Sequence, residues 1–311
     1  KYSLSLVDKA GICNNPHCII DYSYFGLILF RIYFKGGYIS ESDKVNIITQ
    51  LSANPYVISI YELTGEFDLA IEVASPNPSR FNKELKRLAN VIPTLNNYKI
   101  ILNLVTHIYP RSYLINKPDR TEGIGSEIII GGDRDVEAFS DNELAVMRSL
   151  LISPRARLST LARLSDLNVK TVKSILKDLQ SRKILRAVKQ VVDTNQLGIQ
   201  KFRLFLKLHN LSHDRELVLR QYLLTTKEIV QVNKTVGDWD LEIDIESYDK
   251  KSIRYLILQL REDFKDLIET FNITEFYQYY KRSFLPTYLF QDGEKKPEIK
   301  PDLITPYGPG V

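Results

Sequence analysis

The sequence carries the same residue pattern twice, at positions 172 residues apart. Asp21, Gly26, Phe30, Arg31 and Lys35 recur as Asp193, Gly198, Phe202, Arg203 and Lys207. Further along, Gly65–Leu69 recurs as Gly237–Leu241 at the same offset. Arg111–Leu114 recurs as Arg282–Leu285, at an offset that is one residue shorter. A solenoid repeat has a period of only about 20–50 residues, so this pattern indicates a duplicated domain.

The length and composition set the limits for this duplication. The 311 residues have room for two or three domains, each with its own core. No apolar run approaches the roughly 18 residues of a membrane helix, and the first residues lack a signal-peptide pattern, so we expect no membrane partner. Cys13 and Cys18 are too few for a disulfide framework, which favours a cytoplasmic location.

Each copy changes its periodicity in one order: strand, helix, two strands joined by a hairpin, helix and strand. The predicted ranges in the first copy are Leu27–Lys35, Ile47–Leu51, Val57–Glu62, Asp68–Val73, Ser79–Asn90 and Tyr98–Tyr109. Those in the second copy are Lys201–Leu208, Leu217–Leu223, Glu228–Lys234, Asp240–Ile245, Lys251–Phe264 and Thr270–Tyr280. This βαββαβ order predicts an α+β fold with two ferredoxin-like domains. The sheet face without helices needs cover, so we expect the copies to pack together, within one chain or between chains.

The segment between the copies is a different kind of domain. Ser140 followed by Glu143 is a capping box that opens one helix. A short helix is predicted over Leu158–Ser165, and Asn168 is a suitable N-cap for a third helix that runs to about Arg182. Two short helices, a tight turn and a longer helix are typical of a helix-turn-helix.

Positive charge is concentrated in this segment. From Glu137 to Lys189 there are eleven Lys and Arg against five Asp and Glu, a net of +6, while the whole chain has only +4. A solvated helix face is the simple alternative, but the localised charge favours double-stranded DNA as a partner. The predicted DNA-contacting residues are Asn168, Lys170, Thr171, Lys173, Ser174 and Lys177, the flanking Arg155 and Arg157, and the wing residues Arg186 and Lys189.

Four stretches of this region carry a family resemblance: Arg157–Ala162, Leu167–Val172, Leu179–Leu185 and Val192–Gly198. With the two hairpins, they resemble the Lrp/AsnC family of bacterial and archaeal transcription regulators over nearly everything from Ile12 to Leu285. The resemblance implies a winged helix-turn-helix that leads into a ferredoxin-like ligand-sensing (RAM) domain. This chain departs from the family pattern in having the sensing domain twice, on both sides of one DNA-binding domain.

The first twelve residues extend the repeat. Lys1, Leu4, Val7 and Ile12 fall on Lys173, Leu176, Leu179 and Ile184 at the same offset. They indicate the end of another recognition helix, and thus a tandem duplication whose N-terminal helix-turn-helix is mostly missing here; a chance leucine pattern is the alternative. The predicted divisions are residues 1–18 (remnant or divergent end of an N-terminal helix-turn-helix), 19–115 (first RAM-like domain), 116–136 (linker), 137–190 (winged helix-turn-helix), 191–288 (second RAM-like domain) and 289–311 (extended tail).

The family resemblance also implies a small-molecule effector, usually an amino acid, that binds near the hairpins at an interface between sensing domains. The candidate effector-binding residues are Gly65, Phe67 and Asp68 in the first copy, and Gly237, Trp239 and Asp240 in the second. An aspartate could accept an ammonium group, and the glycine amides a carboxylate. A hairpin that needs its glycine for backbone geometry explains the same residues equally well.

No catalytic or metal-binding pattern stands out in the sequence. Cys13, His17 and Cys18 offer three ligands where structural zinc needs four, so we expect free thiols and no metal or other cofactor. The absence of a nucleophile or phosphate-binding motif predicts that the chain is not an enzyme.

Two alternatives to a DNA-binding regulator remain. One is a tandem enzyme like siroheme decarboxylase, which shares this architecture. Such an enzyme is expected to place basic and histidine side chains around the hairpin, where Ile58, Ile60, Tyr61, Val230, Val232 and Asn233 stand instead. The other is a chromatin-type protein that organises DNA with little sequence preference.

Overall fold

The computed structural model describes residues 13–36, 40–92, 94–114, 127–192, 197–209 and 212–291. These residues form a mixed α+β structure, as predicted. The first repeat contains β2 (Ile28–Phe34), α2 (Glu41–Ala53), β3 (Val57–Thr64), β4 (Leu69–Ser75), α3 (Pro78–Val91) and β5 (Tyr98–Ile108). The second repeat contains β8 (Gln200–Leu208), α7 (His213–Thr225), β9 (Ile229–Val236), β10 (Leu241–Ser247), α8 (Lys250–Asp263) and β11 (Ile268–Arg282).

The two repeats agree in local detail because equivalent residues begin equivalent helices. Ser40 caps α2 and Ser212 caps α7, each through a side-chain oxygen that accepts a backbone N–H of the first helical turn. Asn77 and Asp249 cap α3 and α8 in the same manner. Such caps satisfy backbone N–H groups that have no partner inside the helix.

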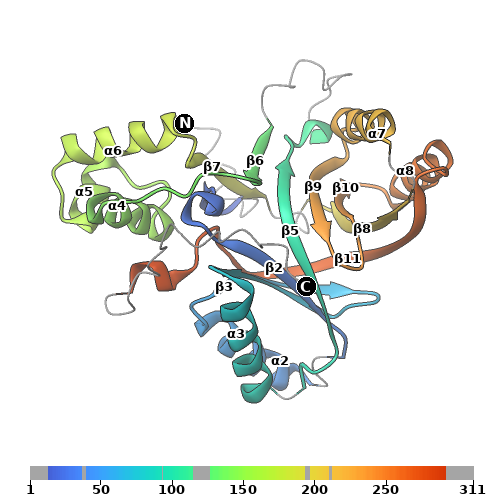
Figure 1. Ribbon diagram of the computed structural model, residues 1–311, viewed down its shortest axis with the longest axis horizontal. Coiled ribbons are helices and arrows are strands. Elements are labelled where there is room, and N and C mark those ends of the chain that lie inside the picture. The colour runs from blue at the N-terminus through green and yellow to red at the C-terminus, as the bar shows by residue number, and fades with distance from the viewer. Residues whose placement is uncertain are drawn as a thin grey trace, which may run out of the picture.

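The strands of the two repeats join edge to edge in one closed ring. Strand β5 pairs with β2 of its own repeat and with β9 of the other, while β11 pairs with β8 and with β3. The ring order is thus β2-β4-β3-β11-β8-β10-β9-β5, which returns to β2 within the described residues. The two sheets therefore close against each other within one chain, and their shared interior lies between the repeats (Figure 1).

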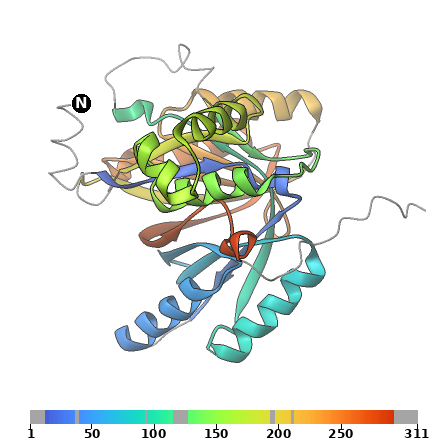
Figure 2. The same cartoon turned by 90° about the vertical axis from the view of Figure 1, so that its left-hand side faces the viewer.

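The helices cover the outside of this ring. Helices α2 and α3 lie over the first repeat, and α7 and α8 over the second (Figures 1 and 2). Ile32, Leu51 and Leu85 belong to the apolar core beneath the first pair of helices. Leu204 and Leu256 belong to the equivalent core beneath the second pair. Each repeat thus buries its own apolar layer, which is the main stabilising contribution to such a fold.

The helical segment between the repeats contains α4 (Asp141–Ile152), α5 (Leu158–Ser165) and α6 (Val169–Ser181), followed by β7 (Leu185–Val192). Its predicted capping box is confirmed, because the Ser140 side chain accepts the Glu143 amide and Glu143 accepts the Ser140 amide. Strand β7 pairs antiparallel with β1 (Cys13–Ile20), its equivalent at the offset of 172. This two-stranded sheet lies between the helices and the ring (Figure 1).

One strand departs from the prediction of a linker over 116–136. Strand β6 (Ile128–Gly131) pairs with the end of β5, since Ile128–Ile130 is a β-branched run that suits a strand. At Gly131 (φ 86°) a Cβ would come within 2.6 Å of the Leu104 carbonyl oxygen, so only glycine fits there. Most of the predicted N-terminal remnant and of the C-terminal tail, namely residues 1–12 and 292–311, lie outside the described residues.

Short 3-10 turns complete the fold: η1 (Tyr22–Phe25), η2 (Ser112–Leu114) and η4 (Thr287–Phe290). Among the described residues, every helix is too short or too polar to span a membrane.

Candidate functional site

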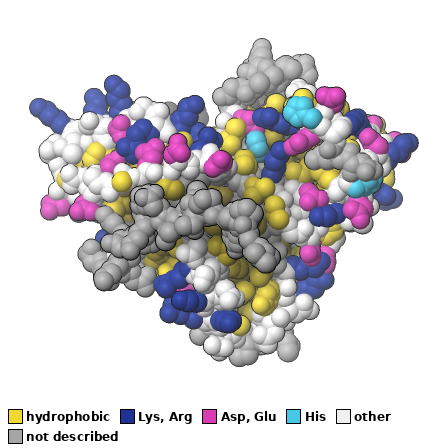
Figure 3. Space-filling view, viewed as in Figure 1, with side chains coloured by type: hydrophobic (Ala, Val, Ile, Leu, Met, Phe, Trp, Pro, Cys, Tyr) yellow, Lys and Arg dark blue, Asp and Glu magenta, His cyan; other side chains and the backbone are white. Residues whose placement is uncertain are grey.

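Helix α6 presents the predicted cationic face to solvent. Its N-cap Asn168 accepts the Thr171 amide through Oδ1 at 2.8 Å, and Asp166 makes the preceding turn with φ 54°. Val172 and Leu179 are buried against the other helices of this segment. On the opposite side, the exposed residues are Lys170, Lys173, Ser174 and Lys177, and Thr171 is half-buried. The lysine and arginine side chains of this region project from the upper left of the molecule in Figure 3.

The arginines and lysines predicted around α6 do not all join that face. Arg155 and Arg157 are exposed just before and at the start of α5. Arg186 instead forms an ion pair at 3.0 Å with Asp21, whose carboxylate is fully buried. Lys189 is half-buried. Burial and the nearby positive charges of Arg111 and Arg282 hold its pKa well below the usual value. These two wing residues therefore lie at the junction between β1, β7 and the ring, and their predicted contact with DNA stays a prediction.

The two predicted hairpins pack against the opposite repeat. Gly65 has φ 127° and lies against Ile273 and Thr274 of β11. Gly237 has φ 142° and lies against Ile100 and Ile101 of β5. Each hairpin thus supports one of the two seams where the repeats join.

The side chains proposed for effector binding at these hairpins pack or hydrogen-bond within the chain, although Trp239 Nε1 has no hydrogen-bond partner among the described residues. Phe67 is fully buried and Trp239 is 9% exposed, and both belong to the aromatic cluster inside the ring. Asp240 accepts the Leu208 amide at 2.8 Å and pairs with Lys207 at 3.2 Å. Asp68 accepts the Gly36 amide in the equivalent manner. These contacts within the chain are sufficient to explain the geometry of the two hairpins.

The interior of the ring contains a buried network of charges. Arg31 pairs with Glu72 at 2.7 Å, and the equivalent Arg203 pairs with Asp244 at 2.7 Å, each across neighbouring antiparallel strands. Arg203 also donates to the hydroxyl oxygens of Tyr33 and Tyr61, both at 2.7 Å. Burying charge is costly unless it is paired and hydrogen-bonded, and this network meets both conditions.

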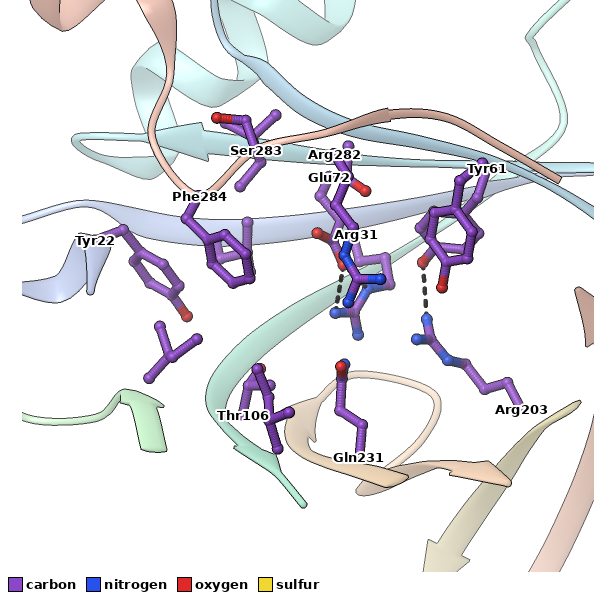
Figure 4. A pocket seen from close by; sticks show the side chains of 16 residues that line it. Tyr22, Arg31, Tyr61, Glu72, Thr106, Arg203, Gln231, Arg282, Ser283 and Phe284 are labelled. Atoms are coloured by element: carbon purple, nitrogen blue, oxygen red, sulfur yellow. Dashed lines mark hydrogen bonds and ion pairs between the residues drawn. The ribbon is translucent and has the colours of Figure 1, made fainter. Parts of the chain in front are cut away.

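A small cavity lined by both polar and apolar side chains lies beside this network (Figure 4). It encloses about 40 Å³. Since one water needs roughly 10–15 Å³, this space suits only a few waters or one small chemical group. Arg31, Thr106, Gln231, Arg282 and Phe284 are among the residues that line it.

A second group of basic side chains adjoins the cavity, where β1 pairs with β7. His17 lies directly opposite Lys189 in the register of these strands. The His17 ring stacks on Phe284 at 5.4 Å, and Phe284 also lines the cavity. Burial and the nearby charges of Arg282, Lys189 and Arg111 lower the pKa of His17 to about 3.

Sequence reasoning missed this basic group although the repeat contains it. The offset of 172 relates His17 to Lys189, and the shifted end of the repeat relates Arg111 to Arg282. Comparing the copies for basic residues as well as for identity would have revealed these two pairs. Of the two cysteines predicted as free thiols, Cys18 is buried and free, and burial raises its pKa to about 12. The described residues contain no cluster of three or more metal-ligating side chains.

Comparison with known proteins gives structural matches only. No protein-family model and no curated protein sequence matches this chain. The crystal structure of the siroheme decarboxylase NirDL matches 92% of this chain and 82% of its own, with 14% identity and a TM-score of 0.57. Its complex with an iron-uroporphyrin III analogue matches the same shares at 14% identity, with a TM-score of 0.58. A transcriptional regulator of Neisseria meningitidis in complex with L-Met covers 50% of this chain and 100% of its own, with 12% identity and a TM-score of 0.44.

The match to NirDL concerns the fold of nearly the whole chain, both repeats included. It contradicts our prediction that the chain is not an enzyme, because a protein of this full-length architecture is one. The prediction rested only on missing sequence motifs, and the fold shared with an enzyme shows that this ground was insufficient. At 14% identity the match shows the fold that the two proteins share.

Proposed function

We propose that the chain is a DNA-binding transcription regulator of the Lrp/AsnC type, in which a winged helix-turn-helix is joined to two RAM-like sensing domains. The observation that carries this proposal is the exposed face of α6. Lys170, Lys173 and Lys177 all point away from the apolar side that Val172 and Leu179 bury. Lysines on one face of a recognition helix can neutralise DNA phosphates while the helix lies in the major groove.

The surroundings of α6 support this docking. Arg155 and Arg157 lie at the start of α5, outside α6 itself, and both are exposed. Arg182, at the far end of α6, is held by Glu143 at 2.9 Å and Asp178 at 3.0 Å and so stabilises the segment internally. The exposed lysines Lys170, Lys173 and Lys177 follow α6 from its first turn, the part that enters the groove in helix-turn-helix proteins.

The proposal is tested by binding of duplex DNA to the full chain. The double variant Lys173→Ala/Lys177→Ala removes two cations without touching a buried residue. We expect weaker binding in fluorescence anisotropy, and a slope of log K against log salt concentration that flattens by about 1.8, since each phosphate contact contributes about 0.9. Lys83→Ala/Lys86→Ala on α3 is the matched control, because it removes two exposed lysines far from α6. Equal affinity and slope in both double variants would refute the proposal.

A second candidate is an enzyme of the siroheme decarboxylase kind, favoured by the full-length match to NirDL, which includes a complex with an iron-uroporphyrin III analogue. Pockets for small molecules and cofactors commonly have volumes of about 300–1,000 Å³. The cavity of about 40 Å³ would have to widen greatly to hold one. Titration with iron-uroporphyrin III, followed by the porphyrin absorption band, separates the two candidates, since saturable binding would support the enzyme.

A further inference from the structure

The positive charges between the repeats exceed the negative charges that face them. Four interior cations are matched by four carboxylates within ion-pair distance: Arg31 and Arg203 with Glu72, Glu242 and Asp244, Lys201 with Asp244, and Arg111 with Glu246. Lys189 and Arg282 make no ion pair within 4.0 Å among the described residues. Two cations thus remain without an ion pair in the described part of the chain: Lys189 on β7, and Arg282 at the end of β11, whose guanidinium lies over the Tyr279 ring.

His17 is a third unsatisfied group at the same place. It is 8% exposed, and neither of its ring nitrogens has a hydrogen-bond partner among the described residues. Buried polar atoms in native proteins are nearly always hydrogen-bonded, so an orphaned imidazole calls for a missing partner. The strand register and the stacked Phe284 ring hold this imidazole beside Lys189.

We propose that His17, Lys189 and Arg282 form a binding site for an oxyanion, namely a carboxylate or phosphate group of a small metabolite. A guanidinium, an ammonium and an imidazole N–H are all donors, and together they complement one anionic group. Arg111 lies close enough to act on both His17 and Lys189, but Glu246 holds it at 2.6 Å. Arg111 therefore strengthens the local positive field without being free to bind. The site is separate from α6 and does not depend on the proposed DNA binding.

The electrostatic surroundings of Lys189 also favour binding of an anion. Burial and the charges of Arg111, Arg282 and Lys201 hold the pKa of Lys189 well below its usual value, although Glu246 opposes them. A bound anion would favour the charged ammonium and raise that pKa. Binding would therefore be coupled to uptake of a proton over the pH range between the two values.

Isothermal titration at low ionic strength tests the site in the full chain, with inorganic phosphate in one arm and succinate in the other. We expect saturable binding of one anion per chain in at least one arm, which also distinguishes phosphate from carboxylate. Lys189→Gln and Arg282→Gln should each weaken that binding about 10–100-fold, as loss of a charge-assisted hydrogen bond does. Lys86→Gln, an exposed lysine on α3, is the matched control and should leave it unchanged.

Two further readouts keep the test decisive if a variant folds poorly. In wild-type protein, the binding heat should change with the ionisation enthalpy of the buffer, because a proton is taken up. In NMR, the imidazole resonance that moves on adding the anion should be the one missing from His17→Gln. The proposal is overturned if neither anion binds saturably, if binding survives both substitutions, or if the His17 resonance does not respond.

Discussion

The guanidinium of Arg31 in the first repeat hydrogen-bonds the carboxylate of Glu242 in the second, in the interior of the strand ring. Arg31 is 1% exposed and Glu242 is fully buried. The same carboxylate accepts the hydroxyl of Tyr33 at 2.7 Å and the amide of Asn233 at 3.1 Å. One carboxylate therefore joins three partners from both repeats and helps to hold the two sheets together.

Replacing Glu242 by Gln should strongly destabilise the protein. The change keeps the shape but leaves Arg31 with only Glu72 as its charged partner, and breaking a buried ion pair costs about 3–5 kcal/mol. Urea denaturation should show this loss in the free energy of unfolding. Asp266→Asn, which breaks the exposed pair with Arg215 on the surface, is the control and should have a much smaller effect. Equal losses in the two variants would show that the interior network does not stabilise the ring.

His17 should make the protein less stable as the pH falls below neutral. Its pKa is about 3 in the folded chain against an ordinary 6.5, so between these values the unfolded chain binds a proton that the folded chain does not. Stability is therefore fully present above pH 6.5 and decreases toward pH 3, by up to about 1.4 kcal/mol per pH unit. Thermal unfolding from pH 7 to pH 5 should show this slope, and His17→Asn should flatten it. A slope that persists in His17→Asn would assign it to other groups.

The two hairpin glycines should differ in how poorly they tolerate a side chain. Both have positive φ, where a non-glycine residue costs about 1–3 kcal/mol. A Cβ at Gly237 would also lie 3.2 Å from the Ile100 carbonyl oxygen, whereas at Gly65 the nearest atoms are 3.6 Å away. We expect Gly237→Ala to destabilise the protein more than Gly65→Ala in the same denaturation assay. The reverse order would mean that the seam at β5 adapts more easily than the seam at β11.

The sequence was sufficient to predict most of the local structure, because helix and strand periodicity are local properties and the repeat supplied each prediction twice. Val57–Glu62 was predicted as a strand, and β3 spans Val57–Thr64. The closure of the strand ring could not be predicted from these local properties. Its seams pair β5 with β9 and β3 with β11, and no local pattern indicates which strand edges meet across more than a hundred residues.

The candidate functional residues also differ in whether the sequence alone could predict them. The face of α6 could be predicted from helical periodicity and charge, since both are properties of one short segment. The pair of His17 and Lys189 depends on antiparallel pairing between strands that belong to different repeats. Lys189 was therefore grouped with its sequence neighbours on the wing, although its structural neighbours are Arg111 and Arg282.

The role of Arg186 can be tested directly, because stabilising the fold and contacting DNA predict different effects of its replacement. Its partner Asp21 is fully buried and also accepts the Gly131 amide at 3.0 Å and the Ser23 hydroxyl at 2.7 Å. Arg186→Met leaves that buried carboxylate without its cation, so it should lower the free energy of unfolding by about 3 kcal/mol or more. Since Arg186 is turned toward Asp21, the salt dependence of DNA binding should stay unchanged in folded Arg186→Met protein. A flatter salt slope with unaltered stability would instead return Arg186 to the DNA-contacting surface.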